Sequence, residues 1–269
     1  MSLSHAFPTP SHADAAAAIV DFAQSWPVRA ALLVNSCARG VATPQSDLDM
    51  ALLVDPALPA DARLAIEAAW AERYRRDSVF RRLEANGPFA RVHLDVIDGQ
   101  YTPTVWDDGG GPDGFELEIG NHLAYAVALW QDGTAFAELR ARWLPYYDEA
   151  LRAARLRMAR DAVALDIERV RSYARRDIPF YAFDRLYHGA QELLQAVFIA
   201  RRVYPLAYNK WIHEQVVGWL GLPELYDELA GLIALGRMER GALLDRADRL
   251  AIMLDRYAPD DAVAVTAEA

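Results

Sequence analysis

Two aspartates, Asp47 and Asp49, stand one residue apart at the start of a short apolar run, residues 48–54, that has the length of a β-strand. Because side chains alternate between the two faces of a strand, both carboxylates point the same way. Carboxylates at that separation can share a pair of divalent metal ions roughly 3.5–4 Å apart, an arrangement used for in-line displacement at phosphorus. Oxygen ligands suit Mg²⁺ rather than zinc, so the pair predicts a magnesium site.

A small polar turn precedes the two aspartates and indicates a phosphate site. The sequence Asn35-Ser36-Cys37-Ala38-Arg39-Gly40 follows an apolar run at 28–34 that also has strand length. We expect the turn to lead into a short helix. The Ser36 hydroxyl and free backbone N–H groups at such a place can hold the phosphates of a nucleotide.

A third carboxylate would complete the metal site, and Asp95 fits this role. Residues 90–97 alternate like a strand, with Val92, Leu94 and Val96 on one face and Arg91, His93 and Asp95 on the other. The sequence by itself does not place this strand beside the one that carries Asp47.

The elements that position these residues fall into two parts. The first part alternates predicted helices at 11–26 and 59–85 with predicted strands at 28–34, 48–54 and 90–97, and we expect Ser11 to cap the first helix. Residues 99–114 are rich in Gly, Pro and Asp and favour a linker or loop. Beyond it we predict helices at 116–130, 134–143, 146–176, 180–203, 210–220, 223–235 and 241–257. The prediction is an α+β fold: a small mixed-sheet domain over 1–115, then an all-helical bundle domain over 116–269.

Composition limits the class of protein. The chain has 269 residues, 53% of them hydrophobic, and a net charge of -10, a balance that disfavours a grip on long nucleic acid. No apolar run approaches the roughly 20 residues of a membrane span, and residues 1–10 lack the pattern of a secretory signal. The single cysteine, Cys37, excludes an internal disulfide framework and a cysteine-rich zinc site. Together these features favour the cytoplasm.

The turn and the aspartates together resemble the signature of a known family. Ser36-x-Ala38-Arg39-Gly40, then Ser46-Asp47-x-Asp49, with Asp95 on a later strand, is similar to the DNA polymerase β-like nucleotidyltransferase superfamily. The motif is most similar to that of the small-molecule branch, which includes kanamycin and streptomycin-type nucleotidyltransferases. The resemblance covers residues 28–54, extends to Asp95, and is only architectural over the helical half. It departs at Asn35, where the family has glycine. Asparagine tolerates left-handed backbone better than most residues, so we expect the turn to be kept.

The resemblance implies roles for further residues. It implies that Ser36 and Ser46 hold ATP or another nucleoside triphosphate, with Mg²⁺ on Asp47, Asp49 and Asp95. Arg39 either contacts phosphate or pairs with a neighbouring carboxylate.

In the helical half, the kanamycin-type enzymes supply a glutamate that deprotonates the acceptor hydroxyl. Glu192, which shares a helical face with Asp184 and His188, fits that role, with Asp95 as the alternative base. The passage Tyr204-Pro205…Lys210-Trp211 resembles one in which a lysine contacts the triphosphate. A solvated helix face for the glutamate, and a surface lysine at a helix end, are the structural alternatives.

The resulting expectation is a Mg²⁺-dependent nucleotidyltransferase. It would move a nucleoside monophosphate to a hydroxyl of a small molecule or of a protein side chain, and release pyrophosphate. An aminoglycoside-like compound is one candidate acceptor. One alternative is a catalytically weak or inactive nucleotide-binding sensor or antitoxin-like protein of the same superfamily, which Asn35 favours. A nucleic-acid-modifying transferase is the second alternative, and the low pI disfavours it. A homodimer is left open, because many small transferases of this kind place their cleft between two subunits.

Overall fold

The computed structural model describes residues 5–104 and 110–260 and divides into two compact units. The sheet unit comprises the described residues up to 102 together with 118–145, and the helical unit comprises the described residues of 103–117 together with those from 146 onward. We expected a single boundary near residue 115. Instead the chain passes between the units near residues 102, 117 and 145, because the segment 118–145 returns to the sheet.

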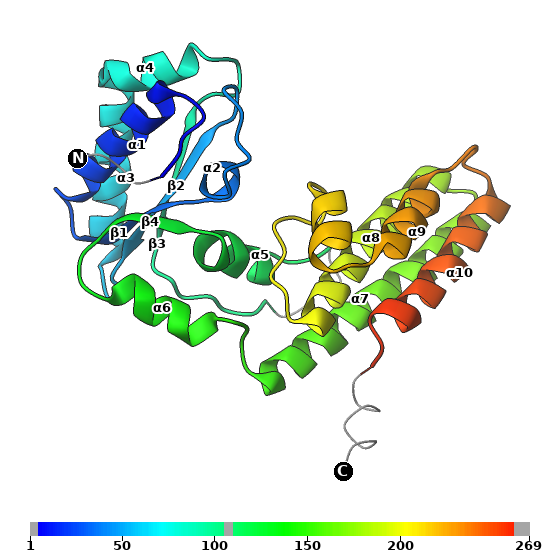
Figure 1. Cartoon of the computed structure of the whole chain (residues 1–269). Coiled ribbons are helices and arrows are strands. Elements are labelled where there is room, and N and C mark those ends of the chain that lie inside the picture. The colour runs from blue at the N-terminus through cyan, green and yellow to red at the C-terminus, as the bar shows by residue number, and fades with distance from the viewer. Residues whose placement is uncertain (1–4, 105–109, 261–269) are drawn as a thin grey trace. The chain divides into compact units, whose positions relative to one another are not determined.

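A mixed sheet of four strands forms the centre of the sheet unit, in the order β3-β2-β1-β4 (Figure 1). The strands are β1 (Val28–Leu33), β2 (Leu48–Val54), β3 (Val92–Ile97) and β4 (Val127–Gln131). Strand β1 is antiparallel to both β2 and β4, whereas β2 and β3 are parallel. The expected α+β class, with a small mixed sheet, is thus what the structure shows.

The helices of the sheet unit differ in detail from the prediction. They are α1 (Pro10–Ala23), α2 (Asn35–Ala38), α3 (Ala60–Arg76), α4 (Ser78–Glu84) and α6 (Ala135–Trp143). The predicted helix 59–85 breaks at Asp77, whose carboxylate accepts a hydrogen bond from the Val79 N–H and so begins α4. Helix α1 is capped by Thr9 rather than by Ser11.

The segment predicted as one helix over 116–130 was assigned wrongly. It forms a short helix α5 (Phe115–Ile119), a π-helical turn η1 (Gly120–Ala124) and then strand β4. Strand β4 pairs with β1, and its Val127 and Leu129 pack on the core of the sheet unit. A short apolar run is compatible with either a helix or a strand, and here the pairing with β1 stabilises the strand.

Alternation along β2 determines which face carries polar groups. Leu48, Met50 and Leu52 are fully buried in a core that also contains Ile19 and other residues of α1. Because strand side chains alternate, Asp47 and the residues at 49 and 51 lie on the opposite face from α1. Packing of the apolar side chains of β2 against α1 thereby fixes Asp47 and Asp49 on the other face of the sheet.

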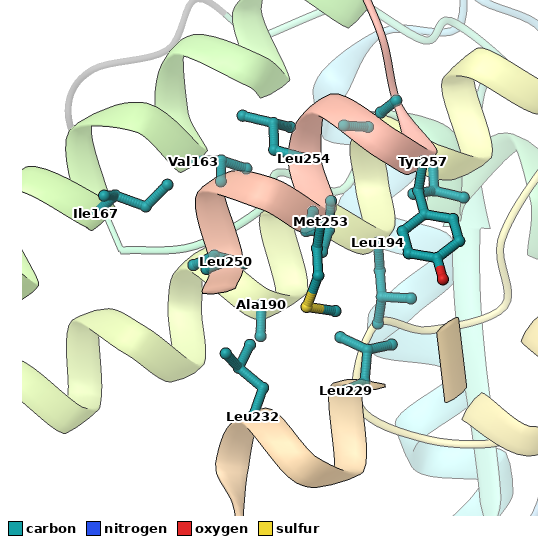
Figure 2. Close-up of a cluster of buried hydrophobic side chains, with 14 of the residues drawn as sticks. Val163, Ile167, Ala190, Leu194, Leu229, Leu232, Leu250, Met253, Leu254 and Tyr257 are labelled. Atoms are coloured by element: carbon teal, nitrogen blue, oxygen red, sulfur yellow. The ribbon is translucent and has the colours of Figure 1, made fainter. Parts of the chain in front are cut away.

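The helical unit is built from four helices and a π-helical segment among its described residues. These are α7 (Glu149–Arg175), α8 (Pro179–Arg201), η2 (Glu214–Trp219), α9 (Pro223–Ile233) and α10 (Arg240–Tyr257). The predicted helices agree within a few residues, except that 210–220 holds η2 rather than an α-helix. Figure 2 shows Val163 of α7, Leu194 of α8, Leu229 of α9 and Met253 of α10 meeting in one core. No helix within the described ranges is both long and apolar enough to cross a membrane.

A buried ionic cluster holds the segment before α5 to the bundle. The Arg155 guanidinium, 2% exposed, donates to both carboxylate oxygens of Asp113 at 2.6 and 2.7 Å and to both of Glu116 at 2.7 and 2.9 Å. Glu116 also accepts from the Tyr147 hydroxyl at 2.8 Å and from Gln195 Nε2 at 3.0 Å. Every oxygen of the fully buried Glu116 is thus hydrogen-bonded, as a buried charge requires.

Replacing Arg155 by Met is therefore expected to lower the free energy of unfolding by roughly 3–5 kcal/mol, because Glu116 would remain as a buried, uncompensated charge. Urea unfolding measures the difference. The matched control is Arg157→Met, at an exposed position on the same helix, which should change the stability by less than about 0.5 kcal/mol. Equal effects of the two substitutions would contradict this account of the cluster.

Candidate functional site

The parallel pairing of β2 with β3 brings three possible metal ligands together. In the register of these strands Asp49 lies beside His93, and Asp47 directly precedes β2. His93 Nε2 is 3.8 Å from Asp47 Oδ2. One ligand atom from each of Asp47, Asp49 and His93 lies within 4.8 Å of the others, and within the described parts of the chain this is the group of such side chains that could hold a metal ion. The donor set of two carboxylates and one imidazole is chemically suited to a divalent cation.

Asp95, the predicted third carboxylate, is not a member of that group. Its register partner on β2 is Ala51, one step along the same face from the pair of Asp49 and His93. Its charge still acts on Asp49 and favours the protonated form of that carboxyl. The sequence had placed His93 on the correct face, but only the parallel register shows that it lies nearer to Asp49 than Asp95 does.

Burial and like charge both act on Asp49. The pKa of its carboxyl is raised, first by burial and then by the negative charge of Asp47. A hydrogen bond from the Asn35 side chain and the charge of His93 act in the opposite direction. Two partly buried carboxylates that repel each other form a place where a divalent cation is electrostatically favoured.

The turn expected before β2 is present and begins in the left-handed region. Asn35 has φ of +55°, a conformation that glycine and asparagine adopt more readily than other residues. The turn is thus kept with asparagine at this position, and the Asn35 side chain adds the hydrogen bond to Asp49. Cys37 is buried in this turn, and burial raises the pKa of its thiol to about 12, so the protonated thiol is favoured near neutral pH.

Three of the four residues expected to contact nucleotide lie in the segment between β1 and β2. Ser36 is half-buried in α2, and its side chain hydrogen-bonds to Cys37. Arg39 follows α2 and acts electrostatically on Tyr125. Ser46 Oγ accepts a hydrogen bond from the Thr43 N–H at 2.9 Å, so this hydroxyl closes the turn before Asp47.

Glu192 lies on α8 in the helical unit and is 1% exposed. The neighbouring Asp166 is paired with Arg185 through bonds of 2.6 and 2.8 Å. Among the described residues, no group hydrogen-bonds to the buried Oε2 of Glu192. Burial, and then the charge of Asp166, raise the pKa of Glu192 to about 8. A general base must reach the hydroxyl of a bound acceptor, so the buried Glu192 fits that role less well than Asp95, which is exposed on β3.

Lys210 lies in the irregular segment between α8 and η2, where its side chain is exposed. Its backbone carbonyl accepts a hydrogen bond from Gln215 Nε2 at 2.9 Å. The same amide donates to the Ala207 carbonyl, and Gln215 Oε1 accepts from the Leu206 N–H. The buried Gln215 side chain therefore holds the backbone of segment 206–210 by hydrogen bonds. A phosphate contact by Lys210 stays a prediction.

Comparison with known proteins adds no relative to this description. Neither the protein-family models nor the curated protein sequences contain a match to this chain.

The raised pKa of Glu192 predicts a pH-dependent stability. Below the ordinary pKa of a glutamate, the Glu192 carboxyl is protonated in both the folded and the unfolded chain. In that range it does not make the free energy of unfolding depend on pH. As the pH rises towards 8 the unfolded chain gives up the proton and the folded chain retains it, so the free energy of unfolding falls. Glu192→Gln removes this loss and should make the protein more stable than wild type at pH 8, by more than about 1 kcal/mol.

Urea unfolding at pH 5, 6, 7 and 8 measures this effect. Glu224→Gln, at an exposed position on α9, is the control and should follow the wild-type pH profile. A Glu192→Gln profile parallel to that of wild type would show that Glu192 is ionised in the folded protein.

Proposed function

We propose that this protein is a nucleotidyltransferase that moves a nucleoside monophosphate from ATP or another nucleoside triphosphate to a hydroxyl of a small molecule. The observation that carries the proposal is the group of Asp47, Asp49 and His93, which offers a divalent cation three ligands on one face of the sheet. The turn that begins at Asn35 with left-handed backbone adds support, because it directly follows β1, and β1 pairs with the strand that carries Asp49.

In the proposed reaction the acceptor oxygen forms a bond to the α-phosphorus of the nucleotide. The bond from that phosphorus to the β-phosphate oxygen breaks, and pyrophosphate leaves with the electron pair. Asp95, which is exposed on β3, takes the proton of the acceptor hydroxyl. Asp47, Asp49 and His93 would hold the cation, which when bound neutralises phosphate charge and positions the phosphates. Ser36 and Arg39, both in the sheet unit, are the proposed nucleotide contacts.

The donor set bears on the choice of metal. Mg²⁺ is the ion that oxygen ligands alone would favour, and an imidazole among the ligands extends the choice to Mn²⁺ and other transition metals. Mg²⁺ stays the proposed physiological ion, and Mn²⁺ is a suitable probe of the same ligands. The nucleotide and a small-molecule acceptor are the proposed partners, and the proposed compartment is the cytoplasm.

A second candidate function is a nucleotide-binding sensor or antitoxin-like protein with little or no transfer. The observation in its favour is the hydrogen bond between the Asn35 side chain and Asp49, which engages a carboxylate that catalysis would need for the cation. Pyrophosphate release distinguishes the two functions when nucleotides are presented with Mg²⁺ or Mn²⁺ and a panel of hydroxyl acceptors. Nucleotide binding without release would support the sensor.

Asp49→Ala is expected to abolish transfer, because it removes one of the three ligands that would hold the cation, and the cation in turn would position the phosphates. The free energy of unfolding should change by less than about 1 kcal/mol or rise, since the substitution relieves repulsion from Asp47. Metal-dependent pyrophosphate release and urea unfolding measure the two effects. Asp132→Ala, at an exposed position after β4, is the control and should transfer at the wild-type rate. Wild-type turnover by the Asp49 variant would refute the metal assignment.

A further inference from the structure

We infer that His12, a buried residue of α1, is a positioning residue that holds Asp47 in place for the cation. The inference rests on the proposed metal site, but it concerns a residue that contacts neither metal nor nucleotide in that proposal. His12 is 0% exposed, and its Nε2 is 3.0 Å from the backbone carbonyl oxygen of Ser46. Ser46 directly precedes Asp47, so the imidazole acts on the backbone one residue before the ligand.

The hydrogen bonds around His12 define which ring nitrogen carries the proton. A carbonyl oxygen only accepts, so Nε2 must be the donor to Ser46. In a neutral imidazole Nδ1 is then an acceptor, and the Thr9 hydroxyl, at 2.7 Å, donates to it. Thr9 Oγ1 in turn accepts from the Ser11 hydroxyl at 2.8 Å, and Ser11 Oγ accepts from Asn86 Nδ2 at 2.7 Å. Donors and acceptors alternate in one direction along this chain.

That chain connects rigid elements to a loop with few attachments of its own. Thr9 caps α1, and Asn86 follows α4, and both helices contribute to the core of the sheet unit. By contrast, residues 40–45 before Asp47 are mostly exposed. The hydrogen bond from His12 therefore attaches the backbone at Ser46 to α1, which is packed in the core of the sheet unit.

Two other contacts complete the fixation of the Asp47 backbone. The Asp47 carbonyl accepts from Cys37 Sγ at 3.5 Å, and the Leu48 N–H donates to the Arg91 carbonyl at 2.8 Å. Those contacts come from the turn and from the start of β3, whereas His12 supplies the attachment to α1. Without it, the backbone carbonyl directly before Asp47 loses its hydrogen bond to α1.

A second histidine close to the start of the described chain acts in the same way on the other loop. His5 Nε2 is 2.8 Å from the carbonyl oxygen of Cys37, in the turn that carries Ser36. The segment 5–12 thus hydrogen-bonds to backbone carbonyls in both segments that carry proposed site residues. The two imidazoles thus hold the backbone on both sides of the proposed site, as a positioning role requires.

The test measures Mn²⁺ binding by electron paramagnetic resonance of the full chain, at a temperature where each variant is folded. His12→Leu should weaken Mn²⁺ binding by about tenfold or more, the effect typical of groups that orient metal ligands. His12→Gln should recover most of the affinity, because its amide nitrogen can replace Nε2 as the donor to Ser46. Ile19→Ala, at another fully buried position on α1, matches the loss of stability but leaves the loop attachment intact, so its Mn²⁺ affinity should equal that of wild type.

A milder pair of variants covers the case in which His12→Leu does not fold. Thr9→Val removes the hydroxyl that donates to Nδ1 and should weaken Mn²⁺ binding by a smaller factor, and Thr9→Ser should not. Unchanged affinity in His12→Leu, or in Thr9→Val when the first variant is unfolded, would overturn the inference, as would an equal loss in Ile19→Ala. Absence of Mn²⁺ binding by the wild-type chain would instead refute the proposed metal site, and the inference with it.

Discussion

The parallel pairing of β2 with β3 is the constraint on which the candidate site depends. Two parallel strands need a long crossover, and α3 and α4 between residues 54 and 92 supply it. The register places His93 beside Asp49, and a shift of one residue would turn His93 to the opposite face. Burial of Val92 in the same core as Leu48 and Met50 opposes that shift. The apolar face of the sheet thereby fixes the ligands on its polar face.

The remaining charges of the protein serve different purposes in the two units. In the helical unit, Arg155 with its two carboxylates and Arg185 with Asp166 are buried pairs in which acid and base satisfy each other. Removal of one partner there leaves an unpaired buried charge, so these groups act on stability and on the arrangement of helices. In the sheet unit, Asp47 and Asp49 are partly exposed and repel each other. Such an arrangement is unfavourable in isolation and is typical of a site that binds a cation.

Much of the sheet unit could be predicted from the sequence, because its strands and its turn depend on the types and spacing of residues close together in the chain. The two aspartates share a face through simple alternation, and Asn35 adopts the left-handed backbone that its residue type allows. Strand β4 could not be predicted in this way, since its conformation is set by a partner about a hundred residues earlier in the chain. For the same reason His93 was placed on the correct face but was not recognised as the neighbour of Asp49. The burial of Glu192 could not be predicted from helical spacing, which placed this residue on a polar face of its helix. Packing of α8 on α7 buries it.

The central claim is that Asp47, Asp49 and His93 surround one divalent cation. Pulsed electron paramagnetic resonance of the chain loaded with Mn²⁺ tests it most directly, because a coordinated imidazole nitrogen modulates the electron spin echo. The account predicts a ¹⁴N modulation in the wild-type protein that disappears in His93→Asn, with Mn²⁺ still bound at reduced affinity by the two aspartates. Mn²⁺ bound without nitrogen modulation, or with modulation that persists in the His93 variant, would contradict the claim.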